Sequence, residues 1–148
     1  MLIEENTMLS ALKIGRIFPN VNLNNQLTRL ISKKVNLQNV VTLYQLAKKF
    51  GIKTLAEENF KYIERCFITV SESHNFLHLD FRFLVILLSS SQLHITSEIE
   101  VMKAANAWIS YDYHRRSKFA KSLLLTVRLP LLSESVLKKC FTQFLQYT

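Results

Sequence analysis

The sequence predicts an all-α fold of stacked antiparallel helix pairs, with about eight helices and no sheet. The chain contains only two glycines and two prolines in 148 residues, which is too little turn material for many short strands. Apolar residues also recur at steps of three and four along most of the chain, as they do on one face of an α-helix. With 49% apolar and 20% charged residues, the composition is that of a globular domain.

The first half of the chain predicts three helices joined by short turns. Leucines at helical spacing indicate a helix over residues 23–34. Asn36 or Asn39 can cap the second helix, which Gly51 ends by taking the left-handed conformation. Thr54 can cap the third, and the glycine between the two implies an antiparallel hairpin.

The second half predicts shorter helices. Ser71 can cap a short helix that continues through residues 74–77. Asp80 can cap a leucine-rich helix over residues 81–88, which is apolar almost all round and is therefore expected to be central. An amphipathic helix over residues 133–147 completes the chain.

The segment from residue 97 to residue 133 carries the most specific pattern. Ser97 and Glu100 form a capping box, in which the two side chains satisfy backbone N–H groups at a helix start. The apolar stripe that follows includes Trp108, the chain's single tryptophan, which we expect in the core rather than at an exposed interface.

A proline turn closes this segment. Pro130 has no N–H to donate and disfavours helical geometry at Leu129, so the helix over residues 118–126 must end before it. We expect Arg128 to anchor the turn by hydrogen bonds to carbonyls or to a carboxylate such as that of Asp112.

These residues resemble the BACK domain of BTB-Kelch proteins, whose pattern is a Ser-Glu-rich helix start, a Trp-containing helix, an Asp, basic residues and then VRLPLL. The matching positions are Ser97, Glu98, Glu100, Val101, Trp108, Asp112, Arg116, Val127, Arg128, Leu129, Pro130, Leu131 and Leu132. The resemblance extends back to residue 39 and covers roughly two-thirds of the chain, more than a chance motif usually does.

The resemblance implies a non-catalytic helical spacer between a BTB domain, which dimerises and holds the ubiquitin-ligase scaffold cullin-3, and a substrate-binding Kelch propeller. It places the helix pair of residues 39–67 at the cullin groove. On the first of these helices, the face opposite the apolar one would carry Val41, Gln45 and Lys48, with Val41 exposed. We expect the cullin-3 N-terminal region to bind weakly, or only with a BTB domain present.

The expected domain organisation has two parts. Residues 1–22 form an atypical N-terminal segment with no recognisable BTB core, and residues 23–148 form the BACK-like domain, of which residues 23–35 are a candidate remnant of the last BTB helix. No Kelch blade pattern follows the VRLPLL turn. Flanking BTB and Kelch domains are therefore expected partners only if the chain is a fragment.

The net charge of +8 raises an alternative function, a basic all-helical nucleic-acid-binding domain. The densest basic cluster, around Arg115, Arg116 and Lys118, is flanked by aromatic residues. Against this alternative, Asp112 and Arg116 have the spacing of an ion pair within a helix. We therefore favour a solvated basic connection over a nucleic-acid surface.

No catalytic or cofactor site is predicted. Cys66 and Cys140 lie within apolar helices, and two glycines cannot build a phosphate-binding loop. His74 and His78 have the spacing that puts two imidazoles on one helical face, but no further metal-ligand motif accompanies them, so we expect a surface pair without a metal.

The expected location is the cytoplasm, or the nucleus. No window approaches the ~20 apolar residues of a membrane span. The first residues are acidic where a secretory signal is basic, and the cysteines suit a reducing compartment. We therefore expect neither a membrane nor secretion.

Overall fold

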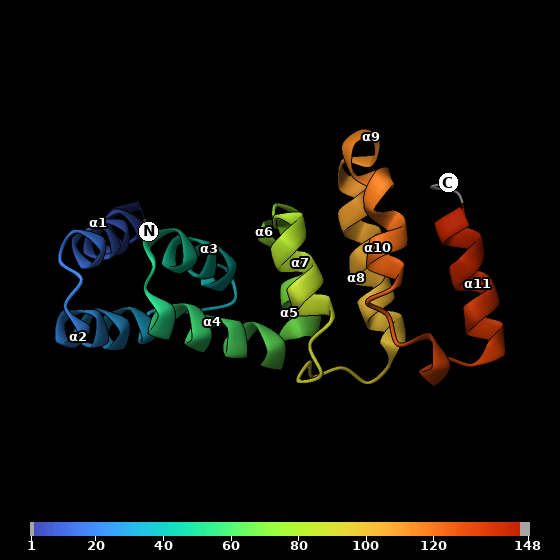
Figure 1. Ribbon diagram of the computed structural model, residues 1–148, viewed down its shortest axis with the longest axis horizontal. Helices are drawn as coiled ribbons and strands as arrows, with labels where there is room; N and C mark the ends of the chain where they lie inside the picture. Colours follow the sequence, from blue (N-terminus) through green and yellow to red (C-terminus); the bar gives the residue numbers. More distant parts are fainter. Residues whose placement is uncertain (1, 146–148) are drawn as a thin grey trace. The chain divides into compact units, whose positions relative to one another are not determined.

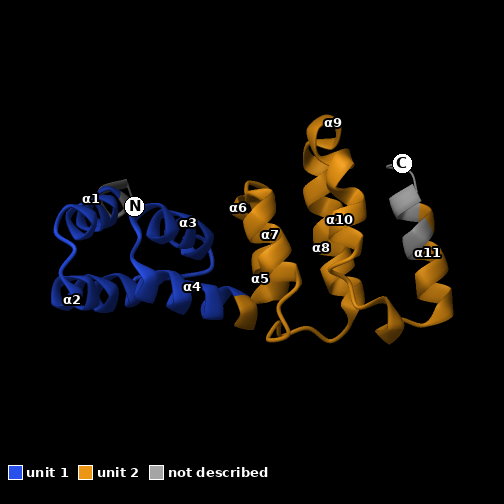
Figure 2. Cartoon of the chain, in the orientation of Figure 1, with its two compact units in different colours: residues 1–63 blue, residues 64–148 orange. Residues whose placement is uncertain are grey.

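The computed structural model describes the backbone of residues 2–145 and the side chains of residues 6–139 and 142. All regular structure in this part of the chain is helical, which confirms the predicted all-α class without a sheet. The chain divides into two compact units, residues 1–63 and residues 64–148 (Figure 2). In the described residues, no helix is both long and apolar enough to cross a membrane.

The first unit is built from α1 (Leu2–Ile17), α2 (Val21–Ser32), α3 (Val40–Phe50) and most of α4 (Lys53–Arg65) (Figure 1). Helix α1 packs against both α2 and α3. The largest fully buried side chains of this unit are Leu12, Ile52, Leu55 and Ile63. Burial of such side chains, at about 1.5–3 kcal/mol each, is the main stabilising contribution to the unit.

Helix α1 was not predicted from the sequence. It lies within residues 1–22, the segment expected to be atypical, and buries Met8 and Leu12. The side chain of Asn20 then caps α2 by accepting hydrogen bonds from the N–H groups of Asn22 and Leu23. The predicted domain boundary at residue 23 is not tested by the division into units and stays a prediction.

The turn between α3 and α4 follows the prediction at Gly51 and departs from it at Thr54. Gly51 has φ of 74°, and its N–H bonds back to α3, so the glycine ends the helix as expected. The predicted Thr54 cap is wrong, because α4 already begins at Lys53. The Thr54 hydroxyl lies instead 3.1 Å from that of Thr28 on α2.

The predicted side-chain cap of α3 by Asn36 or Asn39 is wrong, because the two asparagines bond within the turn that precedes the helix. Asn36 Oδ1 accepts hydrogen bonds from the N–H groups of Gln38 and Asn39, at 2.9 and 3.0 Å. Asn39 precedes α3, but its side chain makes no cap hydrogen bond to that helix. Asn39 Oδ1 accepts from the N–H of Asn36 instead. The pair therefore stabilises the turn before α3.

The second unit continues with six α-helices and one 3₁₀ turn before the proline. They are α5 (Phe67–Ser71), α6 (His74–Leu77), α7 (Phe81–Leu88), α8 (Glu98–Tyr111), α9 (Tyr113–Arg116), the 3₁₀ turn η1 (Ser117–Phe119) and α10 (Ala120–Leu124). The proline turn η2 (Leu129–Leu131) and α11 (Glu134–Leu145) follow. The prediction of about eight helices is close, and α8 is the element that α6, α9, α10 and α11 all contact (Figure 1).

The caps of the short helices agree with the prediction at Asp80 and differ at Ser71. Asp80 caps α7 by accepting a 2.9 Å hydrogen bond from the N–H of Phe83. Ser71 ends α5, where its hydroxyl donates to the carbonyl of Ile68, and Ser73 caps α6. The predicted cap was therefore two residues too early, because serines at both positions have the same local chemistry.

Aromatic side chains of the second unit pack against one another in two groups. Phe67 and Phe76 are fully buried and meet edge to face, with ring centroids 6.3 Å apart. Phe81 stacks on Phe119 with centroids 4.1 Å apart, beside Trp108. The predicted helix over residues 118–126 is shorter than expected, because a 3₁₀ turn replaces its start and Leu124 ends it.

The close approach of α1 and α2 generates the first prediction. A Cβ at Gly15 would lie 2.8 Å from Asn24 Oδ1 and 3.1 Å from Leu27 Cδ1. We expect Gly15→Val to lower the free energy of unfolding by about 1–2 kcal/mol, because overpacking outweighs the gain in helix propensity. Urea unfolding followed by circular dichroism measures this change.

Lys13→Val is the control, because Lys13 is exposed on the same helix. Equal stability of the two variants would show that the close approach at Gly15 costs nothing to fill.

Candidate functional site

The α3–α4 hairpin contains the residues predicted to contact a partner, and the structure changes which of them are available. Val41 is only 1% exposed, so its predicted exposure is wrong. Gln45 is half-buried and Lys48 is exposed. Helix α3 packs against α1, which the sequence did not predict, and its buried residues include Val41.

Lys48 borders a shallow groove at the turn of this hairpin. The groove has a volume of about 340 Å³ and is lined by Ala47, Lys48, Gly51, Lys53, Ala56 and Glu57. Two alanines and a glycine give it a floor without large side chains, while two lysines and one glutamate supply charge. Such a groove can receive one apolar side chain of a protein partner with acidic neighbours.

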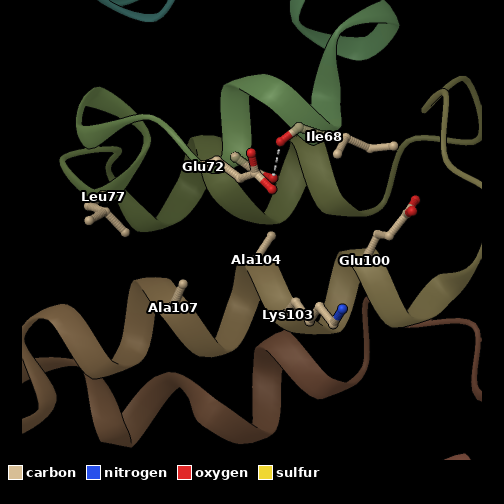
Figure 3. A pocket seen from close by; sticks show the side chains of 8 residues that line it. Ile68, Glu72, Leu77, Glu100, Lys103, Ala104 and Ala107 are labelled. Atoms are coloured by element: carbon tan, nitrogen blue, oxygen red, sulfur yellow. Dashed lines mark hydrogen bonds between the residues drawn. The ribbon is translucent and has the colours of Figure 1, made fainter.

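A second groove lies in the second unit, where α5 and α6 face α8 (Figure 3). Its volume is about 400 Å³. Ile68 and Leu77 come from one side and Ala104 and Ala107 from the other (Figure 3). The charged side chains of Glu72, Glu100 and Lys103 and the hydroxyl of Ser71 complete the lining. The small alanines on α8 leave this space open.

The structural signature predicted around Trp108 is confirmed in the core. Trp108 is 2% exposed, and its indole N–H donates a 2.9 Å hydrogen bond to the carbonyl of Leu79. The Arg116 guanidinium lies over the Trp108 ring, with its carbon 4.0 Å from the ring centroid. Arg116 also donates to the carbonyls of Leu77 and Trp108, each at 2.8 Å.

The predicted Asp112–Arg116 ion pair is wrong. Asp112 instead lies 3.9 Å from the guanidinium of Arg115, which is largely exposed. Arg116 turns inward toward the two carbonyls. Burial lowers the pKa of its guanidinium below the usual value, and this effect exceeds the opposite effect of Asp112 and Tyr111, which raise that pKa.

One member of the predicted basic cluster, Arg116, is withdrawn from the surface. Arg116 is committed to the core carbonyls, and the Lys118 ammonium lies 5.1 Å from the centroid of the Phe119 ring. No observation on the described residues supports the nucleic-acid alternative.

The predicted capping box at the start of α8 is confirmed for Ser97 and wrong for Glu100. Ser97 Oγ accepts a hydrogen bond from the N–H of Ile99. The Glu100 carboxylate accepts from the N–H and the hydroxyl of Thr96, both at 2.9 Å, and not from the N–H of Ser97 as a capping box requires. The carboxylate still satisfies a backbone donor, one residue earlier than expected.

Arg128 anchors the proline turn, as predicted, through a different carboxylate. Its guanidinium and its backbone N–H both bond to Glu98, at 3.2 and 3.1 Å. A third hydrogen bond of 2.8 Å reaches the carbonyl of Ser90. Leu129 and Pro130 then form the 3₁₀ turn that follows the helix stop.

Glu64, near the end of α4 and at the start of the second unit, belongs to the same hydrogen-bond network. Its carboxylate accepts a hydrogen bond from the Ser90 hydroxyl, and its carbonyl accepts one from the N–H of His94 at 3.0 Å. Glu64 and Glu98 are both buried, and each has a hydrogen-bonding partner, as buried carboxylates require.

The two histidines that the sequence placed on one helical face, His74 and His78, meet a tyrosine at the surface. The Nε2 atoms of His74 and His78 are 3.0 Å apart, and the Tyr111 hydroxyl lies 3.2 Å from His78 Nε2. Tyr111 comes from α8, 33 residues beyond His78, so sequence spacing gave no sign of it. Among the described residues, no cluster contains three or more His, Cys, Asp or Glu side chains.

Comparison with known proteins identifies the family. The sequence model of the family described as "BACK: BTB And C-terminal Kelch" matches residues 40–142. This chain belongs to the BACK family. The matched range contains the α3–α4 hairpin, the Trp108 core and the Arg128 turn, which are the features on which the resemblance was based.

Several curated proteins are similar to this BACK domain. Human Kelch repeat and BTB domain-containing protein 2 is 32% identical over 102 residues, covering 69% of this chain and 16% of that protein. Zebrafish (Danio rerio) Kelch repeat and BTB domain-containing protein 8 is 29% identical over 140 residues, covering 91% and 23%. Human Kelch-like protein 28 is 32% identical over 103 residues, covering 70% and 18%. The chain thus spans less than a quarter of the length of these relatives.

The Glu98–Arg128 pair generates the second prediction. We expect Glu98→Ala to lower the free energy of unfolding by about 2–3 kcal/mol, because the buried carboxylate holds two donors of the proline turn. Glu134→Ala is the control and removes an ion pair between Glu134 and Lys138. The two side chains are 83% and 77% exposed, respectively. That change should cost less than about 0.5 kcal/mol.

Urea unfolding followed by Trp108 fluorescence compares the two variants. If both lose the same stability, the Glu98 network does not anchor the turn.

Proposed function

We propose that this BACK domain is a non-catalytic structural and interaction module of a substrate adaptor for a cullin-3 RING ubiquitin ligase. It spaces a cullin-binding BTB domain from a substrate-binding Kelch region. Membership of the BACK family carries this proposal, and the names of two relatives contain both Kelch and BTB. The buried, mutually bonded side chains of the second unit suit a rigid spacer.

The proposed contact with the cullin-3 N-terminal region lies on the α3–α4 hairpin. Gln45 and Lys48 are the predicted contact residues with solvent access, and Lys48 borders the groove that Lys53 and Glu57 also line. Val41 is left out, because a buried side chain cannot touch a partner without unfolding the helix. A groove of this size supports only weak binding by itself, so we expect a BTB domain to strengthen it.

The same proposal places the chain in the cytoplasm or the nucleus, where a ubiquitin-ligase adaptor would act. Flanking BTB and Kelch domains are then its covalent neighbours in a longer protein.

The third prediction tests the cullin-facing surface. We expect the chain to bind a fluorescent cullin-3 N-terminal peptide at high micromolar concentration, and Lys48→Glu to weaken binding roughly fivefold, because it reverses a charge at the rim of the contact. Lys121→Glu is the matched control, since it is an exposed lysine on α10 with the same change of net charge. Fluorescence anisotropy measures both.

Absence of peptide binding both to this chain and to a version extended by a BTB domain would refute the proposed function. An equal effect of the two reversals would show that general charge, and not the hairpin surface, attracts the peptide.

A further inference from the structure

Two histidines on the surface of the second unit present their outer ring nitrogens to each other. His74 is the first residue of α6 and His78 follows its last, so the two are four residues apart. Their Nε2 atoms are 3.0 Å apart in a hydrogen bond, in which one ring donates its N–H to the other, and their ring centroids are 4.7 Å apart. A metal ion bound to both nitrogens would take the place of this shared proton. Both side chains are exposed, so an ion from solution can reach the nitrogens.

Helix α8 places a third potential metal-ligand atom, the Tyr111 hydroxyl oxygen, beside this pair. The Tyr111 hydroxyl lies 3.2 Å from His78 Nε2, and the Tyr111 ring centroid is 5.9 Å from that of His74 and 5.2 Å from that of His78. Helices α6 and α8 contact each other, and Arg116 ties the carbonyl of Leu77 to that of Trp108. The backbones that carry the three donors are therefore held together by interactions independent of the cluster.

We propose that His74, His78 and Tyr111 form a surface site for a late first-row divalent metal ion of the Cu²⁺ or Ni²⁺ type. Imidazole nitrogens bind such ions at about 2.0–2.1 Å. Two nitrogens 3.0 Å apart then subtend roughly 95° at the ion, given bonds of that length. Tetrahedral ligands at the same bond length would be about 3.3–3.4 Å apart.

An angle near 90° is that of neighbouring ligands in a square-planar, tetragonal or octahedral complex. Nitrogen and oxygen donors in a tetragonal arrangement select Cu²⁺ and Ni²⁺, whereas tetrahedral sites select Zn²⁺. The Tyr111 oxygen, 3.2 Å from His78 Nε2, fits a further position around the ion, and water would occupy the rest.

The charges around the cluster limit its affinity. The Arg116 guanidinium carbon lies 5.4 Å from the Tyr111 ring centroid and repels a bound cation, while Asp112, which follows Tyr111, acts in the opposite direction. Two imidazoles and one phenol are also fewer strong ligands than the four of a structural zinc site. We therefore expect a reversible site of modest affinity.

Isothermal titration of the purified full chain with Ni²⁺ tests this site, since Ni²⁺ does not undergo redox chemistry with the thiols. We expect one Ni²⁺ per chain. His74→Ala and His78→Ala should each weaken binding at least about tenfold, equal to about 1.4 kcal/mol, because each leaves a single imidazole. Tyr111→Phe should weaken binding by a smaller factor, and His94→Ala and His114→Ala, which alter the two histidines outside the cluster, should leave it unchanged.

Two results would overturn the proposal. The first is no Ni²⁺ binding by the unaltered chain; the second is binding that His74→Ala and His78→Ala leave at full strength. Circular dichroism checks that each variant is folded, and His74→Gln and His78→Gln replace any alanine variant that is not. Cu²⁺ electron paramagnetic resonance of the cysteine-free chain provides a second readout, in which the expected two-nitrogen splitting is lost with either histidine.

Discussion

The second unit depends on how two side chains, Trp108 of α8 and Arg116 of α9, satisfy the carbonyls at the end of α6 and just after it. Helix α6 has only four residues, so the carbonyl of its last residue, Leu77, lacks a helical partner, and Leu79 lies in the connection that follows. The Trp108 indole donates to one and the Arg116 guanidinium to the other. Because Arg116 also lies over the Trp108 ring, one aromatic residue and one cation together satisfy both carbonyls.

The proline turn repeats this arrangement at the other end of α8. Arg128 joins Glu98 at the start of α8 to the carbonyl of Ser90, and Ser90 bonds to Glu64. Two arginines thus connect segments that lie 30 or more residues apart in sequence. Hydrogen bonds from planar guanidinium groups fix the geometry of these segments at little cost in side-chain entropy. The same fixed geometry brings Tyr111 beside the two histidines of α6.

The features that could be predicted are those that depend on one short stretch of chain. The Asp80 cap and the Gly51 stop follow from the chemistry of a few neighbouring residues, and the burial of Trp108 from the helical period of apolar positions. The cap of α6 was predicted at Ser71 instead of Ser73, because the two serines have the same capping chemistry. Helix α1 was missed, although Met8 and Leu12 have helical spacing, and that omission produced the wrong expectation of an exposed Val41. The two grooves and the Tyr111 contact could not be predicted, because each joins separate helices.

The sequence by itself determined the helical class, the family, the helix stops at Gly51 and Pro130, and the burial of Trp108. Backbone geometry and hydrophobic periodicity set these locally, so they need no knowledge of how the helices meet. Only the tertiary structure decided that Glu98, rather than Asp112, receives Arg128, that Arg116 turns inward, and that Val41 is covered. The reason is that the sequence contains several chemically equivalent partners for each charged or apolar side chain. Helix packing determines which of these partners lies close enough to contact it.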